Sequence, residues 1–159
     1  MTAVGMVYNP VPEDKARWAR PQGRAPRFQA RYVAGLGGQA SLGERVGVWS
    51  LYRQGDPEAE FTTCLRRTLK TAVHETGHMF GIAHCTAYEC GMNGSNHRAE
   101  ADSRPLWFCP EDEMKVWWAC RVDPAARYDR LSQFADEHGL APEARFWRAS
   151  RAALAGRPR

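Results

Sequence analysis

The feature that most constrains this chain is one run near its middle, HETGHMFGIAH, which extends from His74 to His84. Residues four apart on an α-helix share a face, so His74 and His78 can present both imidazoles to one metal ion. Gly81 can adopt the left-handed backbone conformation that ends a helix, which would let His84 turn back as a third ligand. The chain is therefore expected to fold around a helix that stops at Gly81.

The residue types in this run predict a particular chemistry. Three neutral histidines leave the fourth position of a zinc ion to water, which is typical of catalytic rather than structural zinc sites. Zinc lowers the pKa of that water and polarises a carbonyl group, and Glu75 is placed to act as the general base. The glycine and the third histidine make the pattern far more specific than H-E-x-x-H alone. The sequence thus predicts zinc-dependent hydrolysis with His74, His78 and His84 as ligands.

The segment after the motif, residues 82 to 109, is rich in glycine, asparagine, serine and cysteine and is expected to be irregular and organised by metal. Three of the five cysteines, Cys85, Cys90 and Cys109, lie in it. An odd cysteine count in a chain without a signal-type N-terminus favours reduced thiols and metal ligation over disulfides.

Short apolar stretches upstream predict strands within residues 3–8, 31–42 and 45–52, with a turn at Gly43 between the last two. Apolar residues at helical spacing predict the helix that carries the motif, capped by Thr62 or Thr63. Further helices are expected from Pro110, over 124–138 and over 142–154. Their tryptophans, Trp117, Trp118 and Trp147, are expected to pack between the helices.

These elements predict an α+β fold, in which a twisted mixed sheet packs on the active-site helix, with the irregular segment and the C-terminal helices below the cleft. The length of 159 residues favours one catalytic domain over 1–159, with 1–81 above the cleft and 82–159 below it. Hydrophobic residues at 43% and charged residues at 25% argue against a disordered or fibrous chain.

Composition and charge favour no class of partner strongly. The net charge of +4 is mild, and no apolar run approaches the roughly 20 residues of a membrane span, so a cytoplasmic location is the default expectation. Residues 15–31 interleave basic and aromatic side chains, as a single-stranded nucleic-acid site would, but their prolines favour a solvated loop. The sequence indicates no oligomeric state.

The run HETGHMFGIAHC, the later CGMNGS and the pair Cys109-Pro110 with Lys115 resemble the long motif of the archaemetzincin (archaelysin) family, within the metzincin clan. The resemblance implies a zinc metallopeptidase. It also implies that Met92 forms the turn beneath the catalytic metal, and that Cys85, Cys90 and Cys109 match three of the four cysteine ligands of a second, structural zinc.

The chain departs from the family pattern at the fourth of those positions, which is Asp112. A carboxylate is an acceptable zinc ligand, so Asp112 could complete the second site, or Cys120 could substitute for it. Asp112 could instead merely favour a helix N-terminus. The family also opens with a strand and a helix ahead of the segment AVGMVYNP, so the upper sheet is expected to be short.

Three surrounding features bear on catalysis. Residues 38–42 resemble the edge strand that pairs with an extended substrate in metzincins. Gly94 stands where many metzincins carry a tyrosine, so no tyrosine is expected to assist, and His97 is more simply a loop histidine.

The leading hypothesis is a peptidase acting on a peptide or small protein. The alternative is a weak or inactive zinc-binding structural or interaction module, and a zinc-dependent nucleic-acid binder is third. Glu75 would be useless to a purely structural site, which favours the enzyme.

Overall fold

The computed structural model describes residues 5–7, 37–51 and 54–155. The basic stretch 15–31 and the first part of the predicted strand 31–42 lie outside these residues. Within them, no helix is both long enough and apolar enough to cross a membrane.

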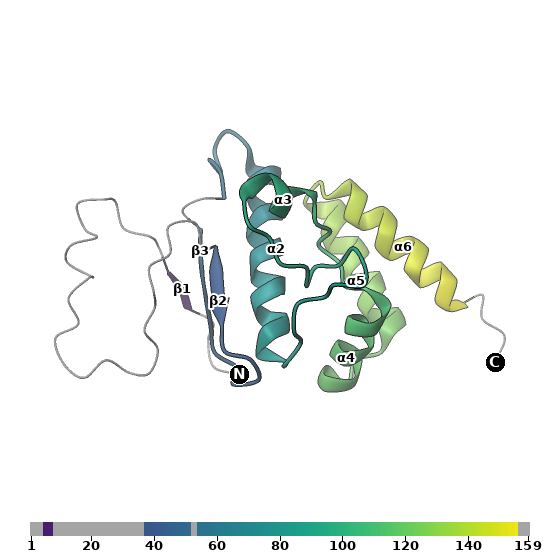
Figure 1. The fold of residues 1–159 in the computed structure, drawn as a ribbon. Coiled ribbons are helices and arrows are strands. Elements are labelled where there is room, and N and C mark those ends of the chain that lie inside the picture. Colours follow the sequence, from purple (N-terminus) through teal and green to yellow (C-terminus); the bar gives the residue numbers. More distant parts are fainter. Residues whose placement is uncertain (1–4, 8–36, 52–53, 156–159) are drawn as a thin grey trace, which may run out of the picture.

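A small mixed sheet stands at one end of the molecule (Figure 1). Its strands are β1 (Gly5–Val7), β2 (Gly38–Ala40) and β3 (Gly47–Ser50), in the order β1-β3-β2. β1 runs parallel to β3 and β2 runs antiparallel to it. The loop between β2 and β3 includes Gly43 at φ 78°, a conformation that glycine adopts without strain. The predicted turn at Gly43 is confirmed.

Helix α2 (Phe61–Met79) carries the first two motif histidines. The prediction that Thr62 or Thr63 caps it is wrong, because both lie inside its first turn and Glu60 is the N-cap, without a side-chain cap bond. The residues just before the helix form a backbone turn, in which the N–H of Glu60 donates to the carbonyl of Asp56 at 2.8 Å.

The end of α2 follows the prediction. Gly81 has φ 80°, the N–H of Ile82 donates to Gly77 O at 3.1 Å, and the N–H of Gly81 donates to His78 O at 2.8 Å. These two bonds form a Schellman motif, which satisfies the last helical carbonyls and reverses the chain. The helix therefore stops where His84 must turn back.

Four helices follow: α3 (Arg98–Ser103), α4 (Pro110–Cys120), α5 (Pro124–Glu137) and α6 (Ala141–Ala155). α2 lies between the sheet on one side and α4, α5 and α6 on the other (Figure 1). The expected α+β fold is confirmed. Helix α3 was not predicted, because its N-cap is His97, whose ring accepts from the N–H of Glu100, and histidine is not among the usual capping residues.

Two buried clusters hold these layers together. One packs around Ile82, Cys90, Met92, Phe108, Cys109 and Val116, and the other around Leu106, Tyr128, Ala135, Leu140, Ala144 and Trp147. Trp147 is buried and Trp117 stands edge-on to Tyr128, as expected. The prediction for Trp118 is wrong: it is 84% exposed, because α4 turns its Val116 side towards the core.

Candidate metal centres and active site

The three motif histidines converge on one point. The Nε2 atoms of His74 and His78 lie 3.1 Å apart, and those of His74 and His84 lie 3.2 Å apart. Nitrogen ligands bound at about 2.0–2.1 Å to a tetrahedral zinc would be separated by about 3.3 Å. The spacing of the three rings therefore fits a single zinc ion.

Backbone carbonyls fix how these rings are turned. Nδ1 of His74 lies 2.8 Å from Gly91 O, and Nδ1 of His78 lies 2.7 Å from Ile82 O. A carbonyl can only accept, so each Nδ1 carries the proton and each Nε2 offers its lone pair to the shared point. Burial lowers the pKa of His74 and of His84, which favours the neutral, ligating form.

Glu75 is buried beside this group, at the meeting of α2 and β2. Its carboxyl group packs directly over Gly38: a Cβ added there would lie 2.7 Å from Oε1 and 2.6 Å from Cγ. Burial raises the pKa of Glu75 to about 7, and a cation at the histidines would pull that pKa down again. A carboxylate that a nearby cation keeps ionised at neutral pH can accept a proton, as a general base does.

Met92 is fully buried, with its sulfur against Gly77 of α2. Its sulfur occupies the space that a side chain at Gly77 would need, so the glycine of α2 allows the close approach. The N–H of Cys85 donates to Met92 O at 3.0 Å, which ties the chain after His84 to the same turn. Gly94 lies against the ring of His84.

A cavity of about 740 Å³ opens over the histidines. Strand β2, the histidine-bearing face of α2 and residues of the segment from Gly91 to Pro105 line it. β2 pairs with β3, and in the described sheet its other edge has no strand beside it. His97 lines the cavity and also caps α3, so it is more than a free loop histidine.

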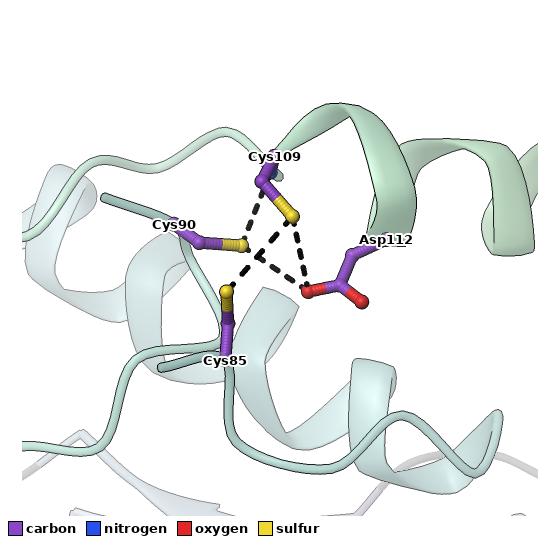
Figure 2. Close-up of side chains that lie close together, drawn as sticks. All are labelled: Cys85, Cys90, Cys109 and Asp112. Carbon is purple, nitrogen blue, oxygen red and sulfur yellow. Dashed lines mark hydrogen bonds between the residues drawn. The ribbon is translucent and has the colours of Figure 1, made fainter. Parts of the chain in front are cut away.

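A second group of candidate ligands is drawn in Figure 2, and two of its members share a buried cluster with Met92. It comprises Cys85, Cys90, Cys109 and Asp112, whose ligand atoms all lie within 4.8 Å of one another. Asp112 Oδ2 is 3.4 Å from Cys90 Sγ and 3.5 Å from Cys109 Sγ, and the sulfurs of Cys85 and Cys109 are 4.0 Å apart. Zinc–sulfur bonds of about 2.3 Å would place tetrahedral ligands about 3.8 Å apart. This group also fits one zinc ion.

The surroundings favour ionised ligands once a cation is present. The backbone N–H groups of Cys109 and Met92 donate to Cys90 Sγ at 3.1 and 3.4 Å, and Lys115 Nζ donates to Asp112 Oδ1 at 2.8 Å. Without a cation, burial raises the pKa of the Cys90 thiol to about 12. Cys120 does not join the group, because it lies exposed at the end of α4. Asp112 also lies in the first turn of α4, so the helix N-terminus interpretation and the ligand interpretation coexist.

A family model for peptidase family M54 matches residues 24–116, more than half of the chain. The chain belongs to peptidase family M54. Archaemetzincin-2 of Homo sapiens is 33% identical over 141 residues, which cover 67% of this chain and 39% of that protein. The archaemetzincin of Archaeoglobus fulgidus is 37% identical over 79 residues, 50% of this chain and 48% of that protein.

Among solved structures, the A. fulgidus archaemetzincin complexed with malonate is 35% identical and covers 54% of each chain, with a TM-score of 0.46. The archaemetzincin of Methanopyrus kandleri is 32% identical and covers 55% of this chain and 47% of its own, with a TM-score of 0.48. The chain spans about two fifths to a half of the length of these relatives. The M54 assignment confirms the archaemetzincin resemblance that the motifs carry.

Sequence reasoning on this M54 chain missed two contacts. Glu75 packs on Gly38, which is distant from it in the sequence, so no local sequence pattern predicts this contact. The clamp of Lys115 on Asp112 could have been found, since oppositely charged residues three apart on a helix are neighbours.

Proposed function

We propose that this protein is a zinc-dependent metallopeptidase in which His74, His78 and His84 hold the catalytic zinc and Glu75 is the general base. The observation that carries the proposal is the convergence of three Nε2 atoms on one point, next to a buried carboxylate and at the floor of an open cavity. Membership of a peptidase family supports it. An inactive zinc-organised module would have no use for a carboxylate in that place.

Each residue then has a defined task. A zinc ion bound at the histidines would supply Lewis acidity, polarising the scissile carbonyl and acidifying water. Glu75 would accept the proton of the attacking water and pass it to the leaving amine. Because Gly38 has no side chain, the carboxyl group of Glu75 can lie between α2 and β2 at the edge of the cavity.

The substrate would be held along β2. All three residues of this strand line the cavity, and one of its edges has no strand beside it in the described sheet. An extended peptide could therefore add to the sheet there by main-chain hydrogen bonds. Such pairing would lay the scissile bond across α2, over the histidines. We therefore propose an extended stretch of a peptide or small protein as the substrate.

We further propose a second, structural zinc held by Cys85, Cys90, Cys109 and Asp112. Four protein ligands complete a tetrahedral shell and leave no position for water, which is the arrangement of a structural site. The ion would join the chain after His84 to the start of α4, beside the buried cluster that contains Met92. The two sites together would unite the halves 1–81 and 82–159 into one catalytic domain.

The test combines metal analysis with hydrolysis of a mixed peptide library by the purified full chain. We expect two zinc ions per chain. We also expect cleavage products that disappear when a chelator removes the metal and that return when zinc is restored. Zinc-loaded protein that cleaves no peptide in the library would contradict the peptidase function.

A further inference from the structure

The walls of the active-site cavity carry an uneven charge. Beyond the histidines, the ionisable side chains that line its described part are Lys70, Arg98, Arg104 and Glu75. Glu75 is the proposed base at the metal, so away from the metal this lining is purely cationic. We call Lys70, Arg98 and Arg104 the basic wall.

Lys70 lies one helical turn before His74 on α2, about 6 Å along the helix axis. Its ammonium group donates to the carbonyl oxygens of Asp102 at 2.7 Å and Ala101 at 3.5 Å, at the end of α3. The nearby Asp102 carboxylate is engaged by Arg67 through two bonds of 2.9 and 2.7 Å. Lys70 is thus paired with neutral carbonyl groups, because the nearby Asp102 carboxylate is already paired with Arg67.

Partial burial makes the charged form of Lys70 less favourable. Burial lowers the pKa of its ammonium group, although the charge of Asp102 opposes the shift. An ammonium group that is partly removed from water is stabilised when an anion binds next to it.

Arg104 faces the same space from the end of α3. Its Nη2 donates to Glu100 Oε1 at 2.8 Å, whereas its buried Nε has no hydrogen-bond partner among the described residues. The other oxygen of Glu100 accepts from the N–H of Asn96 at 2.8 Å. Arg98 adds a third cationic group, with its Nη1 donating to Gln54 Oε1 at 3.1 Å.

We propose that the basic wall is a substrate subsite that binds a carboxylate close to the scissile bond. The carboxylate belongs to an aspartate or glutamate side chain or to the C-terminus of the peptide. The inference rests on the proposed peptidase function and names its substrate class: peptides that are acidic next to the cleaved bond, or peptides cleaved near a free C-terminus.

The test measures binding without turnover, in zinc-loaded full-length protein carrying Glu75→Gln. Labelled, C-terminally amidated octapeptides of neutral residues carry one glutamate, moved position by position, and each is compared with its glutamine counterpart by fluorescence anisotropy. A further neutral peptide is compared as free acid and as amide. We expect about tenfold tighter binding of glutamate at one position, or of the free acid, and weakening of that preference by salt. The two arms tell the two sources of the carboxylate apart.

Two substitutions test whether the basic wall causes the preference for the carboxylate. Lys70→Met and Arg104→Gln are expected to reduce the glutamate-to-glutamine ratio towards one. Asp102→Asn is the matched control, because it breaks the link between α2 and α3 made by Arg67 but removes no cation from the wall. The ratio is expected to persist in this control.

Equal binding of every charged and neutral pair would overturn the inference, as would a preference that survives both wall variants. Loss of the ratio in Asp102→Asn as well would show that the preference depends on the link between α2 and α3 and not on the cations of the basic wall, and would also overturn the inference. Hydrolysis by the protein with Glu75 intact is measured separately, so failure of the peptidase function and failure of the subsite give different results.

Discussion

Asp112 and Cys90 meet across the start of α4, with Asp112 Oδ2 3.4 Å from Cys90 Sγ and Asp112 Oδ1 held by Lys115. The carboxylate thus presents one oxygen to the sulfurs of Cys90 and Cys109 (Figure 2). Its other oxygen accepts from the ammonium group of Lys115. This is the geometry expected of a single-oxygen ligand, and it lies where the family resemblance implies a cysteine.

Removing that carboxylate should remove one metal ion. We expect two zinc ions per chain in the unchanged protein, about one in Asp112→Ala, and two again in Asp112→Cys. Loss of the ion should lower the free energy of unfolding by a few kcal/mol, since metal bound only by the folded state stabilises it. Zinc analysis and the absorption of the cobalt-substituted protein measure both changes. Two ions in Asp112→Ala would exclude Asp112 as a ligand.

Loading of the cysteine site should release protons. Burial raises the pKa of Cys90 to about 12 in the metal-free protein, so its thiol is protonated at neutral pH and must lose that proton to bind zinc. Zinc affinity at this site is therefore expected to rise as pH rises from about 6 to about 8. Titration of metal-free protein with zinc in weak buffer containing a pH indicator measures the release. Tight binding with no proton release would contradict thiolate ligation.

Gly38 should control the position of the base. A Cβ there would lie 2.6 Å from Glu75 Cγ, so Gly38→Ala must displace the carboxyl group. We expect kcat/KM to fall about a hundredfold, as small misplacements of catalytic groups can cause, with zinc content preserved. Gly37→Ala is the matched control, because a Cβ at Gly37 would make only an ordinary contact of 3.7 Å with Thr71. A similar loss in both variants would point to the strand backbone instead.

Gly81 should be required only because it can adopt a left-handed backbone conformation. It has φ 80° and no atom within 4 Å of an added Cβ, so any cost of substitution comes from conformation and not from crowding. Gly81→Val is expected to lower the free energy of unfolding by about 1–2 kcal/mol and to weaken zinc binding, and Gly81→Asn should do less harm. Urea unfolding with and without zinc compares the two. Equal losses would mean that the left-handed turn is not what positions His84.

The parts of the fold that sequence could predict depend on local rules. Helical spacing predicted that His74 and His78 share one face of α2, and Gly81 predicted the turn after which His84 folds back towards them. Helix α3 escaped prediction because His97 caps it, and Trp118 was misplaced because a rotation of one residue on α4 separates core from solvent. The contact of Glu75 with Gly38 and the basic wall depend on how β2 and α3 dock against α2, which no local pattern encodes.

The central claim is that Glu75 performs chemistry at a zinc held by three histidines. The most direct measurement compares zinc content and peptide hydrolysis in the unchanged protein, Glu75→Gln and His84→Ala. We expect Glu75→Gln to keep its full zinc content and to lose hydrolysis by about a hundredfold or more, as removal of a general base does. His84→Ala should lose both the catalytic ion and activity. Undiminished hydrolysis by Glu75→Gln would contradict the account.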